Sequence, residues 1–117
     1  MTCLSGVAKI LNPDAKFYHL DFRSPDVSKV FEDEQFDVMN HHAAQMDVQR
    51  SVSGPHYDAD VNILASINLI ECSKKFGVKR FRYYSSGGPV FGESEYVPGD
   101  EAHSVNPVCL YGVINTQ

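Results

Sequence analysis

The sequence predicts an α/β domain built on a parallel β-sheet. Three strand-like segments alternate with two helix-like segments, an order typical of parallel sheets with right-handed crossovers. The chain has 117 residues, of which 43% are hydrophobic and 21% charged, enough for one hydrophobic core. No internal repeat, low-complexity tract or linker divides it, so we expect one unit over residues 1–117.

The first strand and the first helix are expected near the N-terminus. Residues 17–22, Phe-Tyr-His-Leu-Asp-Phe, predict a short strand. Ser24-Pro25-Asp26 then supplies an N-cap oxygen, a proline for the first helical position and an acid for the first turn. Val27, Val30 and Phe31 recur at helical spacing, which predicts a short helix with one buried face.

The longest predicted element is a helix from about His56 to Phe76. It follows a second predicted strand at residues 36–40 and a loop at residues 41–45. Gly77 stands where a helix commonly ends, and two lysines just before it suit the negative end of the helix dipole. The apolar residues that cover a wide arc of this helix are Tyr57, Val61, Leu64, Ala65, Ile67, Leu69, Ile70 and Cys72.

A third strand is expected at residues 78–85, where three aromatic residues occur close together. Residues 87–110 contain several prolines and glycines and predict a long, turn-rich segment. The three strands and two helices together give the predicted parallel sheet with flanking helices.

Composition excludes several classes of protein. A formal net charge of −5 and the lack of a Lys/Arg run argue against nucleic acid or an anionic membrane as a partner. No stretch approaches a membrane span, and no signal-peptide pattern opens the chain. Cys3, Cys72 and Cys109 form no CxxC pair, so we expect reduced thiols and a cytoplasmic location. The chain contains neither a GxSxG motif nor a phosphate-binding loop with lysine.

A metal site is not expected. His41 and His42 are adjacent, so their side chains point to opposite sides of an extended chain, and the sequence offers no evident third ligand. We interpret both histidines as loop or core residues.

Four short motifs occur in a fixed order, at residues 40–45, 61–64, 85–92 and 107–112. In this order they resemble the NAD-dependent epimerase/dehydratase family, the extended group of short-chain dehydrogenases and reductases. The resemblance covers nearly the whole chain, and the motifs are most like those of enzymes that epimerise UDP-glucose and UDP-galactose at C4. It implies a Rossmann-like sheet, NAD as the cofactor and a nucleotide sugar as the substrate.

The resemblance also implies a cofactor site. Asp21 and Phe22 match the strand-end pair that borders the adenine in relatives. Residues 42–44 match a loop of small residues that lets the pyrophosphate and ribose approach the backbone, because larger side chains would fill that space. The residues implied to contact the cofactor are Asp21, Phe22, His42, Ala43, Ala44 and Asn62.

The resemblance assigns the catalytic roles to Tyr111, Ser85 and Ser86. Tyr111 matches the base that takes a proton from a sugar hydroxyl, and the two serines match the Ser/Thr run beside it, although Gly87 stands where the catalytic hydroxyl most often occurs. An unperturbed tyrosine has a pKa of about 10, and relatives use a lysine four positions later to stabilise the phenolate. Here that position holds Asn115, which is uncharged and can hydrogen-bond a ribose hydroxyl. We therefore expect weak proton abstraction.

Two parts of the family's unit have no counterpart in these 117 residues. The first part is the GxGxxG turn, together with the first and second strands that flank it in a dinucleotide-binding fold. The second is the part that grips the nucleotide sugar. The strand at residues 17–22 should then be the family's third, without its link to the sheet. We expect either direct pairing across the gap or a need for a partner.

Three functions stay open at this point. The first is a truncated epimerase that is inactive on its own. The second is one part of a split epimerase that another chain completes. The third is a non-enzymatic interaction module, because in relatives the helix matching residues 56–76 and the helix after the tyrosine pack across a two-fold axis, so that a homodimer could form.

Overall fold

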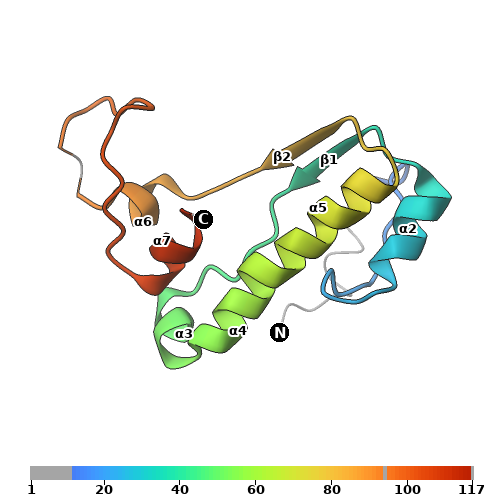
Figure 1. Cartoon of the computed structure of the whole chain (residues 1–117), viewed down its shortest axis with the longest axis horizontal. Helices are drawn as coiled ribbons and strands as arrows, with labels where there is room; N and C mark the ends of the chain where they lie inside the picture. Colours follow the sequence, from blue (N-terminus) through green and yellow to red (C-terminus); the bar gives the residue numbers. More distant parts are fainter. Residues whose placement is uncertain (1–11, 94, 117) are drawn as a thin grey trace.

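A two-stranded parallel sheet and one long helix organise the molecule. The computed structural model describes residues 12–93 and 95–116 (Figure 1). Strand β1 (Val38–His41) pairs in parallel with β2 (Arg80–Tyr83), with Val38 opposite Arg80 and His41 opposite Tyr83. Figure 1 shows the strands running side by side above the long helix, with their carboxyl ends pointing toward the C-terminal helices.

The hydrophobic core lies between the sheet and helices α2 (Val27–Glu34) and α5 (Ala65–Lys75). Successive residues of a strand point to opposite faces, so Met39 and Phe81 share the face that meets these helices. The fully enclosed members of the core are Val27, Phe31, Leu69 and Cys72. Met39 and Phe81 pack against them, together with Phe22, Phe36, Phe76 and Val78.

Helix α2 forms as the sequence predicted, but it begins at Val27, two residues after the proline expected at its first position. The Ser24 hydroxyl accepts a hydrogen bond from the backbone N–H of Asp26 at 3.2 Å, and the helix follows at Val27. It ends at Gln35, which has a left-handed φ of 50° and donates its N–H to the Phe31 carbonyl. Local signals were sufficient for this element because Val27 and Phe31 already mark its buried face.

The strand predicted at residues 17–22 is wrong: the structure gives this segment no strand. A strand requires a neighbour whose backbone completes the hydrogen-bond ladder, and among the described residues β1 and β2 pair only with each other. The segment is held by side chains instead. Lys16 forms an ion pair with Glu34 of α2 at 2.6 Å, and the Asn68 side chain donates to the Phe22 carbonyl at 2.9 Å.

The long predicted helix forms, but it is not a uniform α-helix. It consists of α4 (Pro55–Ala59), a π-helical segment η1 (Asp60–Leu64) and α5, and it ends before Gly77, whose φ is 73°. A π-helical turn contains one more residue per hydrogen-bonded ring than an α-helical turn, and such turns occur frequently at functional sites. Side-chain periodicity predicted the helix and gave no sign of the π segment.

Three further helices surround the carboxyl ends of the strands. Helix α3 (Val48–Ser53) was not expected, and it begins at Asp47, whose carboxylate accepts hydrogen bonds from the N–H groups of Gln49 and Arg50. Helix α6 (Gly87–Phe91) replaces the expected turn. Helix α7 (Leu110–Ile114) carries Tyr111 in its first turn, in agreement with the tyrosine-opened helix of the sequence pattern.

Helices α6 and α7 pack unusually closely because Gly112 has no side chain. A Cβ atom at Gly112 would lie 2.1 Å from the Pro89 carbonyl oxygen of α6, far inside van der Waals contact. The positions of Tyr111 and of the turn before α6 therefore depend on this glycine. Cys3, named in the sequence analysis, lies outside the described residues.

The contact at Gly112 predicts a large difference between two glycine-to-alanine substitutions. Gly112→Ala should lower the free energy of unfolding by about 1–3 kcal/mol, because the added methyl group pushes α7 off α6. Gly88→Ala, in α6, adds a methyl group where no atom lies within 4 Å and should raise stability by about 0.4–1 kcal/mol. Urea denaturation measures both, and equal effects would contradict the close approach.

Candidate functional site

The residues of the candidate site gather where the two parallel strands end. Ligands of open α/β sheets bind outside the carboxyl ends of the strands. In this molecule the segments that leave β1 and β2 at that edge lead to α3 and α6, and α7 returns beside them (Figure 1). Three clusters of polar side chains occur around this edge, one for each group of predicted site residues.

In the first cluster, Asn115 connects the helix that carries Tyr111 to Ser85 and to the end of β2. The Asn115 side-chain amide donates to the Tyr111 carbonyl at 2.7 Å, and its Oδ1 accepts from the Tyr83 hydroxyl at 3.3 Å. The Ser85 hydroxyl donates to the Asn115 carbonyl at 3.3 Å. Asn115, at the position where relatives have lysine, is buried and holds α7 against the end of β2.

Tyr83, which the sequence analysis did not single out, belongs to this cluster. Burial, and then the proximity of Tyr111, raise the pKa of the Tyr83 hydroxyl, which keeps it protonated as a donor to Asn115. Tyr111 is only 7% exposed. Ser86 occupies the N-cap position of α6, its side chain makes no capping hydrogen bond, and it is not part of the Asn115 cluster. The structure thus connects Ser85 to the backbone of the helix that carries Tyr111, through Asn115, while Ser86 makes no contact of this kind.

The second cluster fixes the loop after β1 to the long helix. Asn62 of η1 contacts the backbone of Gln45 twice: its Oδ1 accepts from the Gln45 N–H at 2.8 Å and its amide donates to the Gln45 carbonyl at 3.0 Å. The loop that carries His42, Ala43 and Ala44 is therefore held at its end by a paired backbone contact. All three residues are exposed.

Asp58 supports the paired contact between Asn62 and the Gln45 backbone, which we call the Asn62 clamp. The sequence analysis did not identify Asp58. Its side chain is fully buried, and its Oδ1 accepts from the Gln45 side chain at 2.9 Å and from Asn62 at 3.2 Å. Its Oδ2 has no hydrogen-bond partner among the described residues. The spacing of Asp58 and Asn62, four residues apart on one helix face, was the available sequence signal.

His41 and His42 point in opposite directions, as expected for neighbouring residues at a strand end. The Ser66 hydroxyl donates to the Asn62 carbonyl, so we assign the His41 Nε2–H as the donor to Ser66, at 2.9 Å. Burial, with a smaller contribution from His42, lowers the pKa of His41 and favours this neutral form. The His42 ring stacks on Tyr84 with centroids 3.7 Å apart.

No cluster of three His, Cys, Asp or Glu side chains that could hold a metal ion occurs within residues 12–93 and 95–116. Over the same residues, no helix is long and apolar enough to cross a bilayer.

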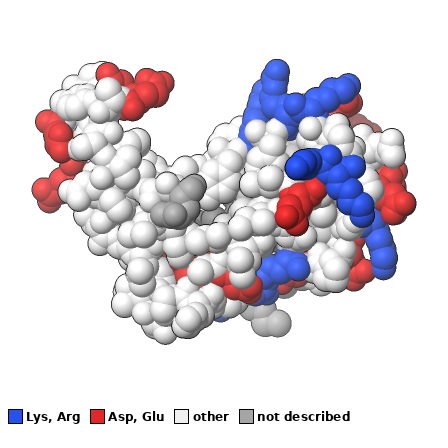
Figure 2. Space-filling view, viewed as in Figure 1, with Lys and Arg blue, Asp and Glu red and all other residues white. Residues whose placement is uncertain are grey.

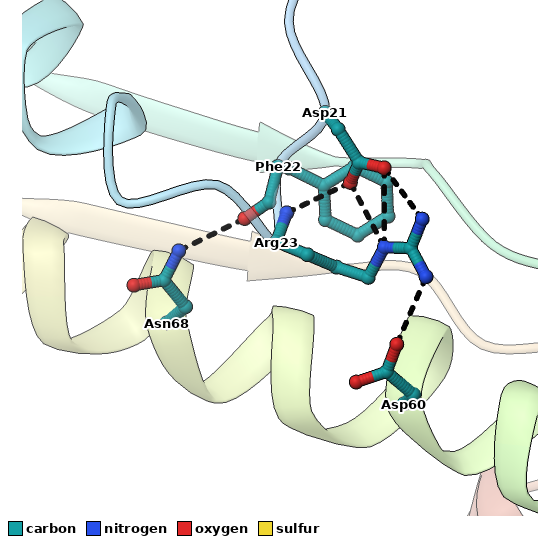
Figure 3. Close-up of polar contacts among 5 residues, drawn as sticks. All are labelled: Asp21, Phe22, Arg23, Asp60 and Asn68. Atoms are coloured by element: carbon teal, nitrogen blue, oxygen red, sulfur yellow. Dashed lines mark hydrogen bonds and ion pairs between the residues drawn. The ribbon is translucent and has the colours of Figure 1, made fainter.

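The third cluster surrounds Asp21 and Phe22, the predicted adenine-facing pair. Figure 3 shows the Arg23 guanidinium between Asp21 and Asp60 of η1, with ion-pair distances of 2.6 and 2.9 Å. The hydrogen bonds from the Arg23 side chain and its backbone N–H lower the pKa of Asp21 to about 2. Asn68 of α5 holds the Phe22 carbonyl in the same view.

A hollow of about 310 Å³ adjoins this cluster. Its lining residues are His19, Leu20, Asp21, Phe22, Arg23, Tyr57 and Val61. Hydrophobic walls with a few fixed polar groups are the common chemistry of sites for planar ligands, so the hollow fits one end of a dinucleotide. The glycine-rich turn that would hold the pyrophosphate is not encoded in these residues, so the fit concerns the adenine end only.

The π segment η1 connects two of the clusters. Its first residue, Asp60, holds Arg23 and through it Asp21, and its third residue, Asn62, holds Gln45. Two residues apart on the helix, Asp60 and Asn62 point to nearly opposite sides and therefore reach different neighbours. The segment η1 thus contacts both sides of the candidate cofactor site.

Comparison with known proteins identifies the relatives of this chain. The model of the NAD dependent epimerase/dehydratase family matches residues 4–115. A provisionally named UDP-glucose 4-epimerase of Methanocaldococcus jannaschii is 40% identical over 109 residues, which cover 93% of this chain and 36% of that protein.

Solved structures agree. The UDP-glucose 4-epimerase of Thermotoga maritima, crystallised with UDP-glucose, is 35% identical with a TM-score of 0.83, over 91% of this chain and 35% of that one. The UDP-glucose 4-epimerase of Thermus thermophilus, in complex with NAD, is 29% identical with a TM-score of 0.82, over 90% and 34%. These similarities confirm the predicted class of a partial Rossmann-like fold, and this chain spans about a third of the length of the proteins it matches.

The Asn62 clamp predicts a strong effect of one asparagine and a weak effect of another. Asn62→Ala removes three hydrogen bonds and leaves the part-buried backbone N–H and carbonyl of Gln45 without this partner, so it should lower the free energy of unfolding by about 2–4 kcal/mol. Asn40→Ala, at an exposed position of β1, should change it by less than about 0.5 kcal/mol. Denaturant titration compares the two, and similar losses would show that the clamp contributes little.

Proposed function

Because the chain belongs to the NAD-dependent epimerase/dehydratase family, we propose that it forms the adenine-facing and tyrosine-bearing parts of a nucleotide-sugar 4-epimerase. The substrate in this proposal is a UDP-hexose, since relatives of similar sequence and structure are UDP-glucose 4-epimerases. The observation that supports it most directly is the convergence of Tyr111 and Ser85 on Asn115 at the carboxyl end of β2.

In the proposed reaction Tyr111 accepts the proton of the sugar C4 hydroxyl, and the ketone that forms is later reduced from its other face. NAD, when bound, supplies the hydride acceptor. Ser85, whose hydroxyl donates to the Asn115 carbonyl, would orient the same sugar hydroxyl, and Ser86 is a neighbouring candidate. Asp21, Phe22, residues 42–44 and Asn62 would place the adenine and ribose.

Asn115 limits this chemistry. A lysine would stabilise a phenolate by its charge, whereas the Asn115 amide is neutral and already bonded to Tyr83 and to the Tyr111 carbonyl. We therefore propose that Tyr111 abstracts protons poorly. This inference rests on the charge and on the hydrogen bonds that the asparagine makes.

The 117 residues also hold no glycine-rich turn for the pyrophosphate. We accordingly propose that they do not epimerise on their own. A split enzyme is the variant of this proposal in which another chain supplies the missing turn.

This proposal predicts the outcome of an NAD titration. The 117-residue chain should show no saturable NAD binding and no interconversion of UDP-glucose and UDP-galactose, because the pyrophosphate has no cradle. The Thermus thermophilus relative serves as the positive control. Binding would be followed by difference absorbance spectroscopy of the nicotinamide and by calorimetry.

A second measurement separates the truncated enzyme from the split one. A polypeptide that carries the strand, the glycine-rich turn and the following helix and strand would be added in excess to the 117-residue chain. Restored NAD binding supports the split enzyme, and no recovery supports the inactive chain. Tight binding by the chain alone would contradict both.

An exposed apolar stripe favours the interaction module as a second candidate function. Leu64, Ile67 and Ile70 on the long helix are 59, 46 and 49% exposed. Ile67 and Ile70 line a groove of about 400 Å³ together with Ile63, Tyr83 and Ile114. Contiguous apolar surface of this kind marks interaction sites, and the resemblance implies a two-fold contact between copies of this helix.

The apolar stripe predicts a homodimer that one charge disrupts. Ile67→Asp places a carboxylate in the centre of the stripe and should convert a dimer into a monomer, because the charge would be buried without a partner. Val52→Asp, on α3 and 64% exposed, is the matched control and should leave the mass unchanged. Light scattering after size exclusion measures both, and a monomeric wild-type chain would contradict this function.

A further inference from the structure

The face of the sheet that points away from the long helix carries polar and charged side chains. Met39 and Phe81 point into the core and His41 contacts Ser66 of α5, so the alternate residues point to the other side. We call this side the open face. It consists of Val38 and Asn40 of β1 with His42 just after it, and of Arg80 and Arg82 of β2 with Tyr84 just after it.

The composition of the open face is unusual for a parallel sheet. Parallel strands are normally covered on both faces and read as nearly continuous apolar runs. Here β2 alternates Arg80, Phe81, Arg82 and Tyr83, and both arginines are exposed. This side of the sheet therefore has the chemistry of a surface that meets water or charge.

The two arginines keep their charge available. Within the described residues, neither Arg80 nor Arg82 takes part in an ion pair, whereas the adjacent Lys79 is paired with Asp37 at 2.7 Å. Val38 is 45% exposed, and Tyr84, stacked on His42, is 49% exposed. The open face thus combines two free guanidinium groups with an apolar and aromatic edge.

The complementary surface lies in the same molecule, on what we call the acidic loop: Glu93 and residues 95–101. Its exposed carboxylates are those of Glu93, Glu95, Asp100 and Glu101. At its tip Val97 is 86% exposed. Figure 2 shows the acidic side chains on the projecting loop between α6 and α7, well separated from the basic side chains above the strands.

The acidic loop is held in a defined shape. The buried His103 ring accepts a hydrogen bond from the Glu95 N–H at 3.1 Å and donates to the Ser104 carbonyl at 2.9 Å. The Tyr96 hydroxyl donates to Asp100 at 2.8 Å. A loop ordered in this way loses little conformational freedom when it binds.

We propose that the acidic loop of one copy of this chain docks on the open face of a second copy, with its carboxylates against Arg80 and Arg82 and Val97 against Val38 and the Tyr84 ring. The contact joins two different surfaces and is therefore head-to-tail, so it can continue along a row of molecules. Nucleic acid is the weaker match, because only two free arginines lie on the open face and the chain as a whole is acidic, with a net charge of −5.

The test is a measurement of solution mass in the Ile67→Asp background, where the apolar stripe contributes nothing. The mass should rise with protein concentration at about 0.01 M salt and fall to the monomer value at about 1 M, since the Debye length shrinks from about 30 to 3 Å. Arg82→Glu alone, or Glu93→Arg with Glu101→Arg, should abolish the association. Lys74→Glu, a charge reversal on an exposed position of α5, should not.

Mixing the two charge-reversed chains provides the decisive result. The unchanged loop of the Arg82→Glu variant can then dock on the unchanged face of the loop variant, and the two reversed surfaces also match in charge, so association should return in the mixture although neither variant associates alone. A monomer at low salt, association that survives Arg82→Glu, or no recovery on mixing would each overturn the proposal. Binding of a single-stranded DNA oligonucleotide through Arg82 without self-association would assign the open face to nucleic acid instead.

Discussion

The paired hydrogen bonds between Asn62 and the backbone of Gln45 are the constraint on which the rest of the site depends. They fasten the end of β1 to the long helix, and from there the chain turns into α3, against which α7 packs. Tyr111 therefore takes its position from contacts that begin at Asn62. Behind the clamp, the fully buried Asp58 has two partners on one oxygen and none among the described residues on the other, so this polar network is only partly satisfied.

Much of the fold could be predicted from the sequence because its signals were local. Ser24 and the spacing of Val27 and Phe31 indicated α2, and the long apolar arc before Gly77 indicated the main helix. The strand at residues 17–22 failed for a non-local reason: its sequence suits a strand, but no described neighbour completes a ladder there. Helix α3 depends on one capping carboxylate, Asp47, that also reads as ordinary surface charge.

Several residues of the candidate site could be predicted from the sequence, but the contacts between them could not. Tyr111, Ser85 and Asn62 could be found by their motifs. The roles of Tyr83, Gln45 and Arg23 could not, because each contacts a residue brought near only by folding, and Asp58 was signalled only by its spacing from Asn62. Asn115 illustrates the difference, since its lack of charge is evident from the sequence, whereas the structure adds that its amide already bonds Tyr83 and the Tyr111 carbonyl.

The π turn at η1 restricts how this chain can vary in length. Each residue of an α-helix turns the chain by about 100°, and the π turn already accommodates one extra residue, so a further residue inserted between Asp60 and Leu64 would rotate α5 against α4 by that angle. Leu69 and Cys72 could then not face the sheet while Asp58 faces Gln45. Single-residue insertions and deletions should therefore occur among relatives mainly in the loop between α6 and α7. The register of the long helix should be kept even in relatives where most of its side chains differ.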